Sequence, residues 1–163
     1  MTSAVASRRL LEPGERLPAA VLHPVDGRPV DLHDLRHDSI VAVVCHPGCA
    51  DCADLTADLD RAAGDLRAWD ALPAAIVTDR DDACRLAADL SLTVLVDDGG
   101  RARAGIGVGA EGGAVLVADR FGTVYRIDPL RADHRRPSVA ELETEARYVA
   151  IQCPECSVPA WSW

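Results

Sequence analysis

The sequence has no lysine, and all 17 of its basic residues are arginine. This pattern is typical of a genomic composition bias, so it indicates no particular function. Aromatic residues are also scarce, with one Phe, two Tyr and three Trp in 163 residues. The core must therefore be built mainly from aliphatic side chains.

The sequence also lacks a basic cluster and a long apolar run. Its formal net charge is −9, and the arginines are scattered among acidic residues, so the charge that neutralises nucleic-acid phosphates is missing. No stretch reaches the roughly 18 apolar residues of a membrane-spanning helix, and the N-terminus has no apolar region of the secretory type. We expect a cytoplasmic protein that binds neither nucleic acid nor membranes.

The length suits one domain with its own core and is too short for two ordinary domains. We expect a flexible lead over residues 1–11, a single domain over residues 12–151, and a tail over residues 152–163 that carries the sequence CPEC.

The six cysteines include two C-x-x-C pairs, Cys49 with Cys52 and Cys153 with Cys156. Reducing systems in the cytoplasm keep cysteine thiols reduced, so structural disulfides are rare there. Two such pairs therefore indicate thiol catalysis or metal binding.

Strands and helices alternate along the sequence. The β-branched run SIVAVV, residues 39–44, predicts a strand buried on both faces, and apolar residues at helical spacing predict a helix from Cys52 to about residue 69. Four further strands are expected at residues 74–78, 93–97, 114–119 and 123–127, with a helix capped by Asp79 after the first of them. A final helix capped by Ser138 and Glu141 follows, whereas residues 13–35 predict a small hairpin. This order favours βαβ units with a parallel sheet core.

Three stretches together resemble the redoxin group of the thioredoxin fold, which includes the alkyl hydroperoxide reductase and thiol-specific antioxidant (peroxiredoxin-like) proteins. They are PGERLPAAVLHPVDGRPVDLHDLR, IVAVVCHPGCADC, and LTVLVDDGGRARAGIGV with the later AVLVADRFGTVYRI. The resemblance implies an α/β, thioredoxin-like three-layer sandwich with a mixed central sheet, an N-terminal β-hairpin extension, and a C-terminal helix before the cysteine-containing tail.

The sequence departs from this family at two places. Peroxiredoxins carry Pro seven residues and Thr or Ser three residues before the peroxidatic cysteine. For Cys52 these positions hold Cys45 and Cys49, and for Cys49 they hold Ala42 and His46, so the hydroxyl that orients a peroxide is absent. Thioredoxin-like proteins also place a cis proline opposite the cysteines, where this sequence has Gly113.

A C-x-x-C pair at the start of a helix suits thiol-disulfide exchange. The unpaired N–H groups and the dipole there favour a thiolate on the first cysteine. We therefore predict Cys49 as the nucleophile and Cys52 as the resolving thiol. His46 is a candidate to add positive charge or to shuttle a proton, and its alternative interpretation is an incidental loop residue. Cys45 is predicted to be a packed thiol, and its alternative roles are a third redox partner or a ligand. Cys84 is expected to be a packed structural residue.

The tail pair has three interpretations. Cys153 and Cys156 are a redox relay to Cys49 and Cys52, or they complete a four-cysteine site for zinc or an iron-sulfur cluster, or they are a surface dithiol without a role.

The leading hypothesis is a thiol-disulfide oxidoreductase that reduces a disulfide or a peroxide and requires no cofactor. Its expected partners are a protein disulfide or peroxide substrate and a reductant of the thioredoxin or glutathione type, and a homodimer is possible. The alternative is a metal-binding protein without turnover that uses both C-x-x-C pairs. A third hypothesis is a degenerate redoxin that binds a partner.

Overall fold

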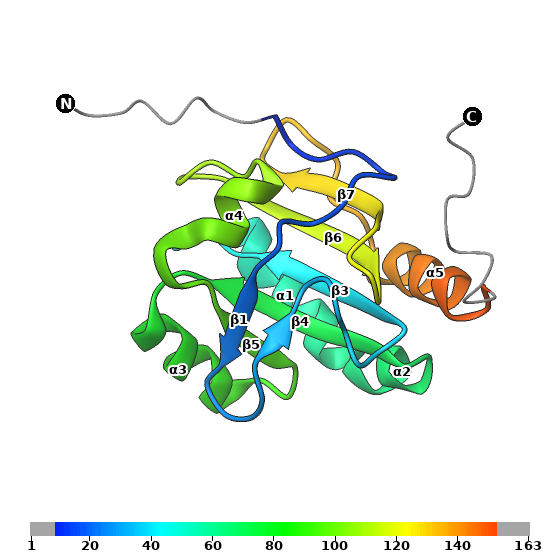
Figure 1. The fold of residues 1–163 in the computed structure, drawn as a ribbon. Coiled ribbons are helices and arrows are strands. Elements are labelled where there is room, and N and C mark those ends of the chain that lie inside the picture. Colours follow the sequence, from blue (N-terminus) through cyan, green and yellow to red (C-terminus); the bar gives the residue numbers. More distant parts are fainter. Residues whose placement is uncertain (1–8, 153–163) are drawn as a thin grey trace.

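The computed structural model describes residues 9–152, which form one mixed sheet covered on both faces (Figure 1). The strand order is β2-β1-β5-β4-β3-β6-β7. The strands are β1 (Val21–Pro24), β2 (Val30–Asp31), β3 (Ser39–Val44), β4 (Ala71–Val77), β5 (Thr93–Val96), β6 (Gly113–Asp119) and β7 (Val124–Leu130).

The centre of the sheet is parallel, as predicted. β3 pairs with β4 and β4 pairs with β5 in parallel, whereas β6 runs antiparallel to β3 and continues through a hairpin into β7. The predicted N-terminal hairpin is confirmed, since β1 and β2 are antiparallel and β1 adds to the edge of β5. Every residue of β3 is buried, which explains its β-branched composition.

The helices divide between the two faces of the sheet. One face packs against α1, α2, α3 and α5, and the other against α4 and the N-terminal segment. The bounds are α1 (Ala50–Arg61), α2 (Ala63–Ala68), α3 (Arg80–Asp89), α4 (Arg101–Ile106) and α5 (Val139–Ala150), with the 3-10 turn η1 (Asp98–Gly100) before α4. The expected three-layer sandwich is thus confirmed.

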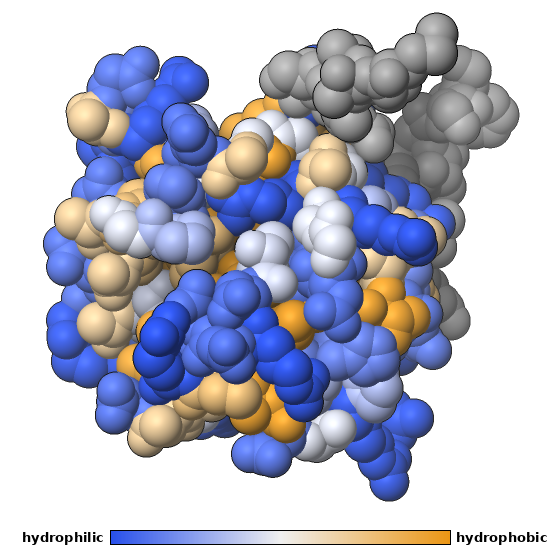
Figure 2. Space-filling view, turned by 90° about the vertical axis from the view of Figure 1, so that its left-hand side faces the viewer, coloured by the Kyte–Doolittle hydropathy of each residue, from blue (hydrophilic) through white to orange (hydrophobic). Residues whose placement is uncertain are grey.

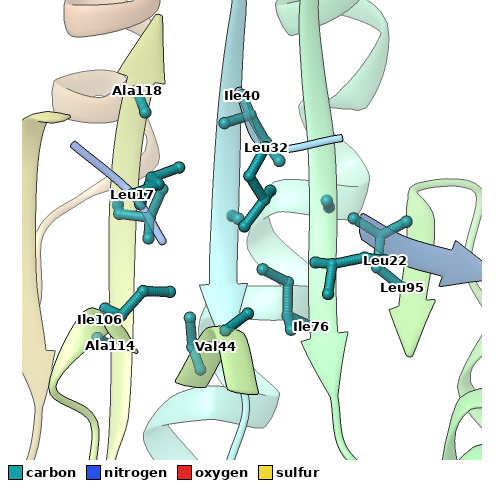
Figure 3. Close-up of a cluster of buried hydrophobic side chains, with 14 of the residues drawn as sticks. Leu17, Leu22, Leu32, Ile40, Val44, Ile76, Leu95, Ile106, Ala114 and Ala118 are labelled. Carbon is teal, nitrogen blue, oxygen red and sulfur yellow. The ribbon is translucent and has the colours of Figure 1, made fainter. Parts of the chain in front are cut away.

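The core consists of two aliphatic clusters, one on each face of the sheet. In the cluster under α4, Leu17 and Leu32 of the N-terminal segment and Ile106 of α4 pack on the central strands (Figure 3). The cluster on the other face receives Leu55 and Leu59 from α1 and further side chains from α5. The outer surface on the side of α3 and α4 is largely hydrophilic with scattered apolar patches (Figure 2).

Two expected boundaries are wrong. The helix predicted from Cys52 to residue 69 is two helices, because the backbone leaves helical geometry at Ala62, with φ −91° and ψ 2°. The strand predicted to begin at residue 74 begins at Ala71 and includes Pro73. Pro73 lies before the part of β4 that pairs with β5, so it has a strand on one side only, where proline is tolerated.

The predicted caps are present. Asp79 caps α3 by accepting from the Asp82 N–H at 2.8 Å, and Ser138 and Glu141 form the capping box of α5. None of the helices within residues 9–152 is long and apolar enough to cross a membrane.

Candidate active site

The C-x-x-C pair lies where β3 gives way to α1, as predicted. Cys49 is the N-cap of α1, and its Sγ accepts a hydrogen bond from the Cys52 N–H at 3.3 Å. Gly48, with φ +76°, turns the chain into the helix, and the Cys49 N–H donates to the His46 carbonyl at 3.2 Å. The sulfur of Cys49 therefore takes the place that a capping oxygen occupies at other helix starts.

Cys52 lies beneath this cap and is 2 % exposed. Burial, together with the neighbouring Cys49 and Cys45, raises the pKa of its thiol to about 12, while a hydrogen bond from the His46 backbone opposes the shift. Cys52 is therefore a protonated thiol at neutral pH. Cys49 is only partly buried and lies at the N-terminus of α1, and its role as the nucleophile stays a prediction.

Gly113 lies directly against the sulfur of Cys52. A Cβ at this position would stand 2.4 Å from Cys52 Sγ and 3.2 Å from the Val44 carbonyl oxygen. Gly113 therefore faces the cysteine pair, as predicted, and this position has no room for a side chain. No cis peptide bond occurs within residues 9–152.

Cys45 is a half-buried thiol at the end of β3. Its Sγ lies 3.6 Å from the Val43 carbonyl oxygen and 3.6 Å from the Thr56 hydroxyl. Burial raises its pKa, and the Thr56 contact and the Arg103 charge lower it less. This arrangement agrees with the predicted packed thiol.

His46 is half-buried in the loop before Cys49. Its Nδ1 is enclosed and has no hydrogen-bond partner among the described residues. Its backbone serves the site through the Cys49 and Cys52 hydrogen bonds. The proposed role of its ring as a proton shuttle stays a prediction.

A cavity of about 560 Å³ opens beside the cysteines, between α1, α3 and the loop after β3. Cys45, Cys49 and Cys52 all line it. The opposite wall combines apolar and charged residues, namely Val77, Leu86 and Leu90 with Asp82, Arg85 and Asp89. The volume is in the range of small-ligand sites and leaves room for more than a peroxide beside Cys49.

Arg103 of α4 is a site residue that sequence analysis missed. It is 6 % exposed, and its guanidinium donates to the carbonyl oxygens of Cys45, Gly109 and Gly112. The partners are backbone atoms on either side of the cysteine pair, so no residue pattern indicated this role.

The remaining cysteines lie elsewhere. Cys84 is exposed on α3, so its predicted packing is wrong: Ala83 faces the sheet, and the next helical position points about 100° away. Cys153 and Cys156 lie outside the described residues. Gln152, just before them, accepts from the Tyr125 hydroxyl at 3.0 Å, near the start of β7 and at the opposite end of the sheet from Cys49.

No metal centre forms within residues 9–152, where no group of three or more His, Cys, Asp or Glu side chains is arranged to hold an ion. The four-cysteine site of the alternative hypothesis needs Cys153 and Cys156, and nothing in the described part of the chain supports it.

No protein-family model and no curated protein matches the sequence. Solved structures do match. A protein assigned as a thiol:disulfide interchange protein DsbE, from Chlorobium tepidum, has a TM-score of 0.67 at 20 % identity, covering 87 % of this chain and 99 % of its own. Peroxidoxin BcpB from Mycobacterium tuberculosis has a TM-score of 0.66 at 16 % identity, with coverages of 88 % and 99 %. The protein has the thioredoxin fold.

The match to Mycobacterium tuberculosis AhpC, with a TM-score of 0.67, 15 % identity and coverages of 86 % and 98 %, agrees with this fold. The fold predicted from the resemblance is therefore confirmed. Within the thioredoxin fold, the C-x-x-C pair of this chain stands at the junction of a central strand and a helix, and Gly113 stands opposite.

Proposed function

We propose that the protein is a thiol-disulfide oxidoreductase in which Cys49 is the nucleophile and Cys52 the resolving thiol. The observation that carries this proposal is the hydrogen bond of 3.3 Å from the Cys52 N–H to Cys49 Sγ, at the start of α1. This bond keeps Cys49 Sγ at the N-terminus of α1, beside the cavity. Cys52, three residues later, is buried in the core behind it.

The first step is attack of the Cys49 thiolate on one sulfur of a substrate disulfide. The substrate S–S bond breaks, one substrate sulfur leaves as a thiolate and takes up a proton, and a mixed disulfide joins Cys49 to the other half. The N-terminus of α1 stabilises the attacking charge.

The second step resolves this intermediate. Cys52 loses its proton and attacks Cys49 Sγ, the second substrate thiol leaves, and a Cys49–Cys52 disulfide forms. Two electrons have passed from the protein dithiol to the substrate. A dithiol or glutathione-type reductant of the cytoplasm then restores both thiols by the reverse exchange.

A peroxide is the second candidate substrate. The Cys49 thiolate would attack one peroxide oxygen and break the O–O bond, which gives a Cys49 sulfenic acid and releases the other oxygen as water or an alcohol after it takes up a proton. The sulfenic acid then condenses with the Cys52 thiol to the Cys49–Cys52 disulfide and releases water. The matching structures named peroxidoxin and AhpC support this branch. The residue three positions before Cys49 is His46 instead of the peroxiredoxin Thr or Ser, and the cavity is larger than a peroxide needs. A disulfide is therefore the preferred substrate.

The test is whether mild oxidation joins Cys49 to Cys52. Reduced protein is treated with limiting diamide, free thiols are alkylated, and peptides are mapped by mass spectrometry. We expect one intramolecular Cys49–Cys52 disulfide, its absence in Cys49→Ser and Cys52→Ser, and its retention in Cys84→Ser, the matched control for an exposed cysteine outside the cavity. Failure of the pair to oxidise would overturn the proposal.

A further inference from the structure

Arg103 is the only basic side chain that is buried within residues 9–152. Its Nε and one terminal nitrogen donate to the Gly109 carbonyl at 3.1 and 3.0 Å, and further bonds reach the carbonyls of Cys45 and Gly112. The side chain therefore leaves the short helix α4 and ends between two loops.

These two loops lie next to the cysteine pair. The Cys45 carbonyl begins the loop that carries Cys49, and the Gly109 and Gly112 carbonyls belong to the loop that leads into Gly113. Gly113 in turn lies against Cys52 Sγ. One guanidinium thus ties the loop before α1 to the loop before β6, on the side where thioredoxin-like proteins carry a proline.

The positive charge of Arg103 has no contact anion. Its guanidinium bonds only to carbonyls in the described part of the chain, and the buried Asp97 uses its two oxygens to accept from the Ala102 and Arg103 backbone N–H groups. A buried cation without a contact partner is unfavourable. Besides Asp97, the groups that interact with its charge are the thiols of Cys45 and Cys52.

We propose that Arg103 is a positioning residue that holds the Gly113 loop against Cys52 and stabilises the Cys52 thiolate in the resolving step. The proposal rests on the proposed dithiol function. Cys52 must lose its proton to attack the mixed disulfide, and its neighbours Cys45 and Cys49 oppose this. Asp97 carries negative charge nearby, and His46 lines the same cavity. Arg103 supplies the opposing positive charge.

The resolving step can be followed alone. In full-length protein with Ser at positions 84, 153 and 156, one equivalent of 5,5′-dithiobis(2-nitrobenzoate) places thionitrobenzoate on Cys49 and releases a first coloured thiolate. Attack by Cys52 releases the second, and mass spectrometry verifies the Cys49–Cys52 product. Both rates are measured from pH 6 to pH 10 in wild type, Arg103→Met, Arg103→Lys and Arg101→Met, the last being an exposed arginine on the same helix.

We expect Arg103→Met to slow the second release about tenfold at neutral pH, equivalent to one pKa unit, and to move its pH profile upward. Arg103→Lys should keep the wild-type profile because it keeps the charge, and Arg101→Met should behave as wild type. The first release should change less than twofold in all variants.

An Arg103→Met protein that resolves at the wild-type rate, or more slowly but with an unchanged pH profile, would overturn the proposal. Arg103→Gln replaces the methionine variant if that one does not fold, and an upward-shifted profile in Arg103→Lys would also overturn it. Absence of the second release in wild type would refute the dithiol function itself, so the two failures are distinguishable.

Discussion

The backbone of Gly113 packs against the sulfur of Cys52, so closely that a Cβ on Gly113 would lie 2.4 Å from Cys52 Sγ. The first residue of β6 therefore closes the space behind Cys52, the proposed resolving thiol. The contact leaves no room for a side chain at position 113, so the glycine is required by the packing of Cys52 and is not a neutral replacement for proline.

Gly113→Ala should destabilise the reduced protein by about 1–3 kcal/mol, because the added methyl overlaps Cys52 Sγ and the surroundings are packed. Urea unfolding measures the loss. Gly112→Ala is the matched control, since a Cβ there meets nothing closer than 3.6 Å and should cost much less. Equal stability of the two variants would show that the contact is not tight.

The stability of the reduced protein should fall as pH rises from about 9. The folded-state pKa of Cys52 is raised to about 12 from an ordinary value of 9.0, so folding favours the protonated thiol. This contribution is fully present below pH 9 and is lost as the pH rises toward 12. Guanidinium unfolding at pH 8 and pH 10.5 should differ by about 1–2 kcal/mol more in the reduced wild type than in Cys52→Ser.

The comparison with Cys52→Ser is needed because Cys45 and Tyr125 also have raised pKa values. Both groups are common to the two proteins, so their titration cancels in the difference. An identical pH dependence in wild type and Cys52→Ser would mean that Cys52 titrates normally.

Ser138→Ala should lower the free energy of unfolding by about 1 kcal/mol, because the serine hydroxyl caps α5 by accepting from the Glu141 N–H at 3.3 Å. Ser138→Asp should retain most of the stability. Thermal unfolding checks both variants. The rate of Cys49–Cys52 oxidation should stay unchanged, and a changed rate would connect α5 to the site in a way that the cap does not predict.

Peroxide consumption with dithiothreitol as reductant should be slow in wild type, because no hydroxyl stands at position 46 to orient the peroxide. It should fall to background in Cys49→Ser, because the proposed nucleophile is then gone. A peroxide-electrode assay measures it. Activity that survives in Cys49→Ser would place the peroxide-reactive cysteine elsewhere in the chain.

The fold and the C-x-x-C position could be predicted because their causes are local in the sequence. A β-branched run marks β3, and helical spacing of Leu55 and Leu59 marks α1. Arg103 could not be predicted, because its partners are carbonyl oxygens from loops that only the folded chain brings together. The predicted packing of Cys84 is wrong because its Ala and Leu neighbours do not determine which side of the helix faces the sheet.

The sulfur cap of α1 makes the start of this helix sensitive to oxidation. A thiolate accepts the Cys52 N–H as a charge-assisted hydrogen bond, whereas the neutral sulfur of a disulfide accepts it more weakly. Amide deuterium exchange in the first turn of α1 should thus be faster in the oxidised protein. A substrate or reductant could then distinguish the two redox states by the local stability of this helix end.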